Sequence, residues 1–359
     1  MAGRVLDRVG DGKTVEPFLA RFRNVGVFSV LLVLIIGSAA FTPDHTFITL
    51  ANVKLLLGVG SEFGIASLGV GVLMIAGEFD LSIGSVLAFC SFVFALLLGA
   101  GVNPFVATLI TVACGALIGT FNGLIVVKGN VVSFIATLGT MLSWRGLAEI
   151  LSRGNTLPAS FGQDSLFGQL FTGDLWGIVP AQGIWFLAFA VTMFLVLDRG
   201  RFGNWIYATG DNAQAARAMA INTGMVKIVC FAIVGALCAF AGVIQTARVT
   251  AFSVHMGEEW ELRAVAAAVV GGVSLQGGRG GLVGIFLGAE IINVVDNMVA
   301  QARLPYEWTY VVFGLVILAS VLLDIQVEKS IQRAGRTDRG VVAPSGEAPP
   351  SSMVPQSHV

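Results

Sequence analysis

The sequence predicts an all-α, polytopic integral membrane protein with about ten transmembrane helices. Of its 359 residues, 55% are hydrophobic and only 12% are charged, whereas a soluble domain carries about 25% charged residues. The apolar residues form long uncharged runs, such as Leu175 to Leu197 and Ile228 to Ala247. A polar, alanine-rich segment, 198–227, separates these two runs. No bilayer core would accept this insert, so it must lie in water or against another protein.

The transmembrane spans follow the apolar runs, because about 20 apolar residues cross a bilayer as a helix. The stretch from Leu81 to Val127 has no charged residue, and the turn residues Gly99 to Pro104 divide it into two spans. The first apolar run is longer than that of a secretory signal, so we interpret it as a span. The predicted spans are 24–41, 51–76, 82–100, 104–127, 131–152, 176–197, 227–247, 261–277, 280–299 and 307–324.

The distribution of basic residues predicts the orientation of these spans. Most of the 21 lysines and arginines fall on one side if the N-terminus is cytoplasmic, and basic residues are enriched in cytoplasmic loops. We therefore expect both termini and the insert 198–227 in the cytoplasm. The predicted organisation is an N-terminal cytoplasmic segment at 1–23, a transmembrane domain at 24–324 and a disordered cytoplasmic tail at 325–359.

A polar segment from Gly77 to Ser85 places two acids and two hydroxyl groups between apolar runs that leave almost no room for a loop. Two structures fit this pattern: a very tight cytoplasmic turn, or a helix broken within the membrane. Asp80 can cap the following helix by accepting hydrogen bonds from free N–H groups near Ile83. Broken helix ends inside membranes also line transport paths.

The ninth span carries several polar side chains, and Glu290, Asn293 and Asn297 share one of its faces. In hydrocarbon such residues face the protein interior or a wet cavity. Three roles stay open: lining a path, relaying protons, or hydrogen bonding between helices. Glycines recur at every fourth residue from Gly115 and again from Gly280, a pattern that allows close helix packing within one subunit or in a dimer.

Motifs for catalysis, nucleotide binding and metal binding do not occur in the sequence. There is no phosphate-binding loop of the type G-x-x-x-x-G-K-[ST], so we do not expect the chain to be an ATPase, and the glycine-rich segment at 276–281 is interpreted as a sharp turn. The 4 cysteines lie in apolar runs without metal-ligand spacing, so no metal site and no cofactor are predicted in this chain. The sequence also contains no recognisable set of catalytic residues, which argues against an intramembrane enzyme.

Several blocks of the chain resemble the permease subunits of bacterial ATP-binding-cassette importers for monosaccharides of the ribose, xylose and arabinose type. The segment from Gly77 to Ser85 is similar to the family signature Gly-Gly-Ile-Asp-Leu-Ser-Val-Gly-Ser, with Glu78 in place of the second glycine. Similar blocks begin at Phe121, Ser133 and Arg145. The longest matching blocks are 203–217 and 261–280.

The resemblance implies a type II importer permease of the bacterial inner membrane, which pairs with a second permease copy as a homodimer. It also implies a cytoplasmic ATPase that binds ATP and Mg, and a periplasmic binding protein that delivers a sugar. Asp211 or Asn212 can cap a short helix from Ala213 to Met219, in which alanines favour the helix and present a flat docking surface. The residues expected to couple to the ATPase are Gly210, Asp211, Asn212, Ala213, Ala215, Ala216, Arg217 and Ile221.

The candidate translocation path is formed by side chains that exchange hydrogen bonds with passing hydroxyl groups, namely Asp80, Ser82, Asn122, Asn293 and Asn297. Two alternatives stay open for the function. A proton- or sodium-coupled secondary transporter would use Glu78, Asp80 and Glu290. A related ABC permease would carry a nucleoside, a branched-chain amino acid or a signalling furanone.

Overall fold

The described part of the computed structural model comprises residues 15–305, 307–315, 318 and 322. The predicted tail at 325–359 and most of the predicted N-terminal segment lie outside the described residues. Helices make up most of what is described: α1 Val15–Phe41, η1 Pro43–Ile48, α2 Leu50–Ile75, α3 Ile83–Gly99, α4 Pro104–Gly129, α5 Ser133–Ser152, α6 Leu166–Thr172, α7 Ala181–Phe194, η2 Leu195–Arg199, α8 Arg201–Asp211, α9 Ala213–Ala218, α10 Thr223–Val249, α11 Trp260–Val270 and α12 Leu282–Gln301.

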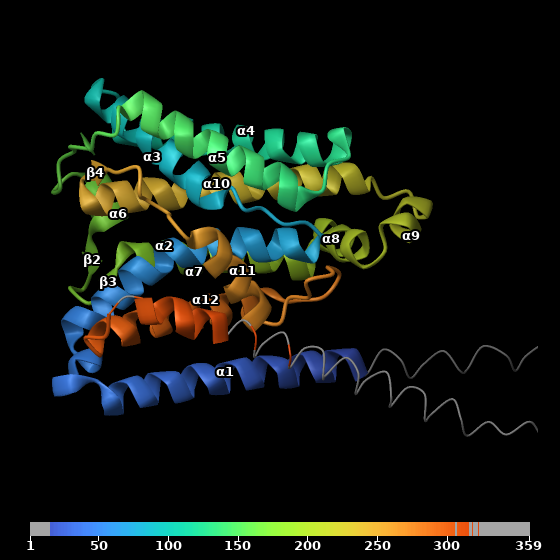
Figure 1. The fold of residues 1–359 in the computed structure, drawn as a ribbon, viewed down its shortest axis with the longest axis horizontal. Coiled ribbons are helices and arrows are strands. Elements are labelled where there is room, and N and C mark those ends of the chain that lie inside the picture. Colours follow the sequence, from blue (N-terminus) through green and yellow to red (C-terminus); the bar gives the residue numbers. More distant parts are fainter. Residues whose placement is uncertain (1–14, 306, 316–317, 319–321, 323–359) are drawn as a thin grey trace, which may run out of the picture. The chain divides into compact units, whose positions relative to one another are not determined.

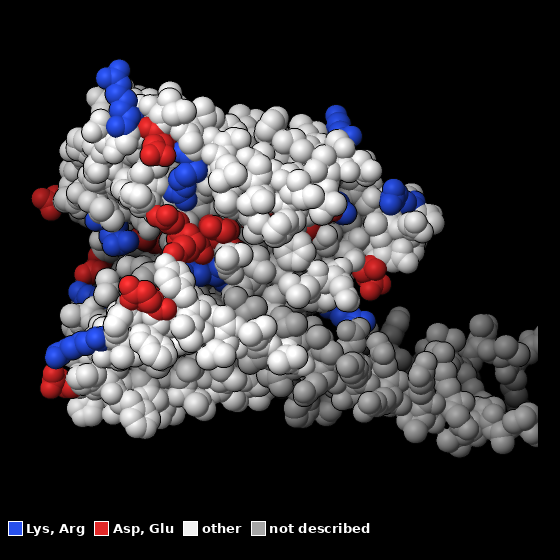
Figure 2. Space-filling model, in the orientation of Figure 1, with Lys and Arg blue, Asp and Glu red and all other residues white. Residues whose placement is uncertain are grey.

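Five described helical segments are long and apolar enough to cross a membrane: Leu50–Ile75, Pro104–Gly129, Ala181–Arg199, Thr223–Val249 and Leu282–Gln301. The shorter apolar helices Val25–Phe41 and Ile83–Gly99 accompany them. Charged side chains are nearly absent from the middle of the face in Figure 2 and gather towards its ends. A charge-free band of this kind suits contact with lipid, because charged groups are costly in hydrocarbon.

Helix α2 lies at the centre of the described bundle. It packs against α7, α10, α11 and α12, and its residues from Gly60 to Ile75 are all buried. Figure 1 shows α3, α4 and α5 on one side of α2 and α10, with α1 and α12 on the other. The same view places α8 and α9 at one end of the bundle and α6 with the short strands at the opposite end.

Glycines allow the backbones of α4 and α10 to approach closely. A Cβ atom at Gly115 would lie 2.3 Å from the carbonyl oxygen of Gly235, and one at Gly119 would lie 2.1 Å from that of Phe231. Gly284 and Gly288 have the same role between α12 and α11, where a Cβ at Gly284 would lie 2.0 Å from the carbonyl oxygen of Gly271. Both glycine repeats therefore pack helices within one subunit.

The structure corrects the eighth predicted span, 261–277. Helix α11 ends at Val270 and spans only about 16 Å at 1.5 Å per residue, about half of a bilayer core. Gly272, Gly277, Gly278 and Gly280 follow it with positive φ angles, which end a helix and which glycine adopts at little cost. The apolar run continues past the helix, so hydropathy alone overestimates its length.

The described structure contains short β-strands in addition to its helices, which the all-α prediction did not include. Strand β1 (Leu157–Pro158) pairs antiparallel with β4 (Ala251–Phe252), and β2 (Asp174–Leu175) pairs antiparallel with β3 (Val179–Pro180). These strands lie at the end of the bundle opposite α8 and α9, together with α6 (Figure 1). The segment between the fifth and sixth predicted spans is therefore partly structured.

Candidate functional site

The polar insert at 198–227 folds as two short helices between the apolar helices α7 and α10. Helix α8 occupies Arg201–Asp211, and α9 occupies Ala213–Ala218. The side chain of Asn212 caps α9, since its Oδ1 accepts hydrogen bonds from the backbone N–H groups of Gln214 at 3.1 Å and Ala215 at 3.0 Å. Of the two caps considered from the sequence, Asn212 and Asp211, the structure uses Asn212.

Helix α9 has one face directed away from the bundle. The outer face of α9 consists of Gln214, Ala215, Ala218 and Met219, all of which are exposed. Met219 is 76% exposed, whereas Ala216 is only 2% exposed. Ala216 therefore packs inward and does not lie on the flat docking surface expected from the sequence. Asn212 and Arg217 are exposed, whereas Ala213 and Ile221 are half-buried.

A glycine junction, formed by Gly77, Gly210, Gly277 and Gly278, connects the insert to the rest of the bundle. The backbone N–H of Gly278 donates to the carbonyl oxygen of Ile75 at 2.8 Å. A Cβ atom at Gly210 would lie 1.9 Å from that same oxygen and 2.5 Å from the nitrogen of Gly278. The end of α8 is thus in backbone contact with the end of α2 and with the loop after α11.

The broken segment, residues 76–82, separates α2 from α3 and has no helical structure. Its residues from Asp80 to Ser82 are buried. Side chains of α5 accept from its backbone: Phe79 N donates to Ser133 Oγ at 3.2 Å, and Leu81 N donates to Thr137 Oγ1 at 3.0 Å. Irregular backbone at membrane depth requires such partners, so the segment matches the broken-helix alternative better than a tight turn.

A chain of buried hydrogen bonds joins three of the sequence-predicted path residues. Asn122 Nδ2 donates to Ser82 Oγ at 2.8 Å, and Ser82 Oγ donates to Asp80 Oδ1 at 2.6 Å. Asp80 also accepts from the backbone N–H of Ser82 at 2.8 Å, one residue before the expected position near Ile83. The Oδ1 atom of Asn122 is buried without a hydrogen-bond partner among the described residues, so it can accept a hydrogen bond from a hydroxyl group.

Asn293 and Asn297 lie apart from that chain, where they join α12 to α2. Asn293 Nδ2 donates to the carbonyl oxygen of Leu56 at 3.0 Å. Asn297 and Asn52 exchange two amide hydrogen bonds of 2.8 and 2.9 Å. Asn293 also reaches Glu290 at 3.5 Å. These contacts match the interhelical role considered for the ninth span.

Sequence reasoning missed the ion pairs between distant parts of the chain, two of which involve the most buried of the paired acids among the described residues. Glu62, which is fully buried in α2, accepts from Arg248 Nε at 2.6 Å and from Nη2 at 3.0 Å. The other pair joins Lys227 Nζ to Glu78 Oε1 and connects α10 to the broken segment. A single acid inside a long apolar run, such as Glu62, predicts a cationic partner, but spacing along the sequence does not identify which one.

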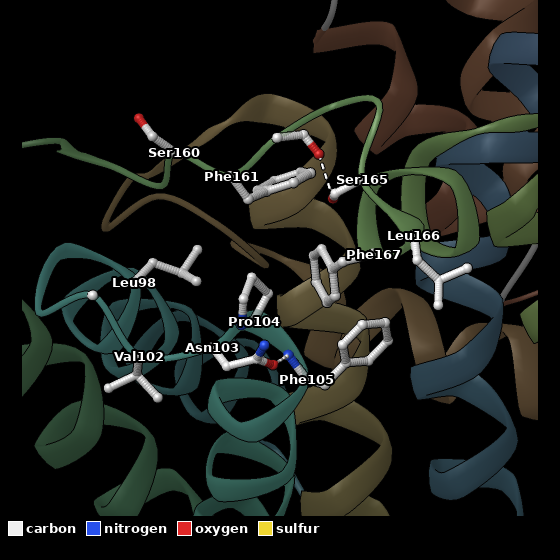
Figure 3. Close-up of a pocket in the computed structure, with 12 residues that line it drawn as sticks. Leu98, Val102, Asn103, Pro104, Phe105, Ser160, Phe161, Ser165, Leu166 and Phe167 are labelled. Carbon is white, nitrogen blue, oxygen red and sulfur yellow. Dashed lines mark hydrogen bonds between the residues drawn. The ribbon is translucent and has the colours of Figure 1, made fainter.

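Two cavities lie at opposite ends of the bundle. The insert cavity, of about 820 Å³, is lined by residues of the broken segment, the α4–α5 turn, α9 and the start of α10. The second cavity, of about 500 Å³, lies between the α3–α4 turn and the loop before α6. Figure 3 shows Asn103 and Pro104 on one wall of this second cavity and Phe161 on the other.

Thr137 provides a test of how the broken segment is held. The substitution Thr137→Val keeps the shape of the side chain but leaves the Leu81 N–H buried without an acceptor, which costs about 1–3 kcal/mol. We expect that loss of unfolding free energy in a denaturant titration of the purified protein. The control is Thr120→Val, because the Thr120 hydroxyl donates to the Ala116 carbonyl of its own helix and to no other group among the described residues, so its loss should cost about 0.5 kcal/mol or less. Equal losses would contradict this account.

Comparison with known proteins shows the family of this chain. Residues 52–321 match the family described as branched-chain amino acid transport system / permease component. The chain is 35% identical to the ribose import permease protein RbsC of Escherichia coli (strain K12) over 300 residues, 82% of this chain and 92% of that protein. It is 34% identical to RbsC of Haemophilus influenzae over 298 residues, 83% of this chain and 91% of that protein. It is 31% identical to the autoinducer 2 import system permease protein LsrC of Salmonella choleraesuis over 293 residues, 81% of this chain and 82% of that protein. The chain therefore belongs to this family of transport-system permease components.

Proposed function

We propose that this chain is the membrane-spanning permease subunit of an ATP-driven importer in the bacterial inner membrane. It would receive a monosaccharide or similar polyol from a periplasmic binding protein and pass it into the cytoplasm. The observation that carries this proposal is the similarity to RbsC, a ribose import permease, along 82% of the chain. The similarity to LsrC of an autoinducer 2 import system makes a signalling furanone the second candidate cargo.

The outer face of α9 supports the proposal of a cytoplasmic ATPase as partner. It presents a large apolar side chain, Met219, and the small side chains Ala215 and Ala218 on the surface of the insert. Exposed apolar groups of this kind mark sites of protein–protein contact. ATP and Mg would be bound by this partner. ATP-driven closure of two such partners would bring the inserts of two permease copies together.

The translocation path in this proposal begins at the buried chain of Asp80, Ser82 and Asn122. Their carboxylate, hydroxyl and amide groups can exchange hydrogen bonds with the hydroxyl groups of a sugar. A path needs weak, transient binding, because tight binding would slow release. The path would run between two copies of the chain, with both termini and the insert of each copy in the cytoplasm.

Uptake of labelled ribose tests the proposed function. The chain is expressed in a strain that lacks ribose transport, together with a candidate ATPase and a candidate binding protein from the same genome. We expect uptake that requires all three proteins and is lost when the ATPase is omitted; autoinducer 2 is the second substrate to be tested. Uptake by the chain alone, driven by a proton or sodium gradient, would instead establish a secondary transporter.

A further inference from the structure

Glu78 and Lys227 form an ion pair where the broken segment and the insert come together. Lys227 Nζ contacts Glu78 Oε1, and the two side chains are only 22% and 12% exposed. Removing one member of such a sheltered pair leaves the other charge without its partner, which costs more than the loss of a surface pair. The contact therefore holds its two chain segments together more firmly than an exposed ion pair would.

The two residues belong to elements with different roles. Glu78 is the third residue of the broken segment and lies two residues before Asp80, which is part of the buried hydrogen-bond chain. Lys227 lies in the first turns of α10, and this helix begins at Thr223 directly after the insert, with Asn222 as its cap. The pair thus connects the helix that leaves the insert to the segment that leads to the proposed path.

The insert cavity gives this connection room to move. Its lining includes Ala213 and Arg217 of α9 together with both Glu78 and Lys227. This cavity of about 820 Å³ is partly open to solvent and lies between α9, the broken segment and the α4–α5 turn. On the side that carries Ala213 and Arg217, α9 therefore meets open space instead of closely packed side chains, while the ion pair joins the start of α10 to the broken segment.

We infer that the Glu78–Lys227 ion pair is a positioning contact that passes a displacement of the insert on to the broken segment and so couples ATP hydrolysis to opening of the path. This inference rests on the proposed function, because it requires an ATPase that moves the insert. Neither residue touches the cargo in this account. Loss of the pair should leave the ATPase bound and active, but each ATP hydrolysed should move less cargo.

The experiment uses the purified complex of this chain, its ATPase and its binding protein, reconstituted in liposomes with ribose as the probe. Glu78→Gln and Lys227→Gln should each lower the amount of ribose transported per ATP hydrolysed by about fivefold or more, the lower end of typical coupling between sites. The exchange Glu78→Lys with Lys227→Glu should restore most of the ratio, and Glu78→Asp should give an intermediate value. Lys128→Gln is the control, because Lys128 is an exposed lysine at the end of α4.

The outcomes separate this inference from the proposed function. If the unchanged chain forms no complex with the ATPase, the proposed function fails. If the complex forms and the single variants transport as much ribose per ATP as the Lys128→Gln control, the inference is overturned. A charge exchange that is as impaired as the single variants would also overturn it, because the contact itself would then not carry the effect. A change in stability alone alters the yield of complex but not this ratio.

Discussion

Met219→Glu should abolish uptake while the protein still inserts into the membrane. Met219 is 76% exposed at the end of α9, so a charged side chain there is solvated and does not disturb the fold. In contact with an ATPase the same charge would be desolvated without a partner. Truncating a central apolar contact already costs about 2 kcal/mol or more, which weakens binding about 30-fold. The measurements are copurification of the ATPase with the permease and uptake of labelled ribose.

Ala215→Glu and Lys128→Glu complete this test. Ala215 lies on the same outer face of α9 and is exposed, so its substitution should also prevent ATPase binding. Lys128 is exposed at the end of α4, and a glutamate there should leave ATPase binding unchanged. Normal uptake by both the Met219 and the Ala215 variants would show that α9 is not the docking element. Substitution of the buried Ala216 would test the folding of the insert and not its docking.

Much of the bundle could be predicted from the sequence, because hydropathy reports directly on residues that lipid or a protein interior must accept. The bounds of α2, α3 and α4 agree with the predicted spans within one or two residues. The insert and a polar cap at Asp211 or Asn212 also followed from local chemistry, because polar side chains cap helices and alanines favour them. The structure uses Asn212. The length of α11 did not follow, because Gly271 to Leu275 continue the apolar run beyond the end of the helix.

Pairings between distant residues could not be predicted. The sequence places Asp80 and Ser82 at the start of one span and Asn122 on the next, and only the packing of α3 against α4 brings Asn122 within hydrogen-bond distance of Ser82. The partner of Glu62 lies 186 residues away, and Arg248 looks from the sequence like an ordinary basic residue at a helix end. For Asn293 and Asn297 the sequence allowed two roles, lining a path or bonding to another helix. In the structure their amides form hydrogen bonds with α2.

Gly210→Ala should be among the most damaging single-methyl changes in the insert. The added Cβ would lie 1.9 Å from the carbonyl oxygen of Ile75 and 2.5 Å from the nitrogen of Gly278. Both are backbone atoms, so the clash can be relieved only by separating α8 from α2 or from the loop after α11. Overpacking of this kind costs about 1–3 kcal/mol or more, and here it displaces the insert that the ATPase would bind. We expect lower thermal stability of the purified protein and strongly reduced uptake.

The matched control for this substitution is Gly139→Ala. Gly139 also lies within a helix, α5, and an added Cβ there meets no atom within 4 Å. In an open helical position alanine is favoured over glycine by about 0.4–1 kcal/mol, chiefly because the unfolded chain loses freedom. The control should therefore melt at an equal or higher temperature and transport normally. If Gly210→Ala behaved in the same way, α8 would have to tolerate a shift away from Ile75, and close contact at the glycine junction would not be required for coupling.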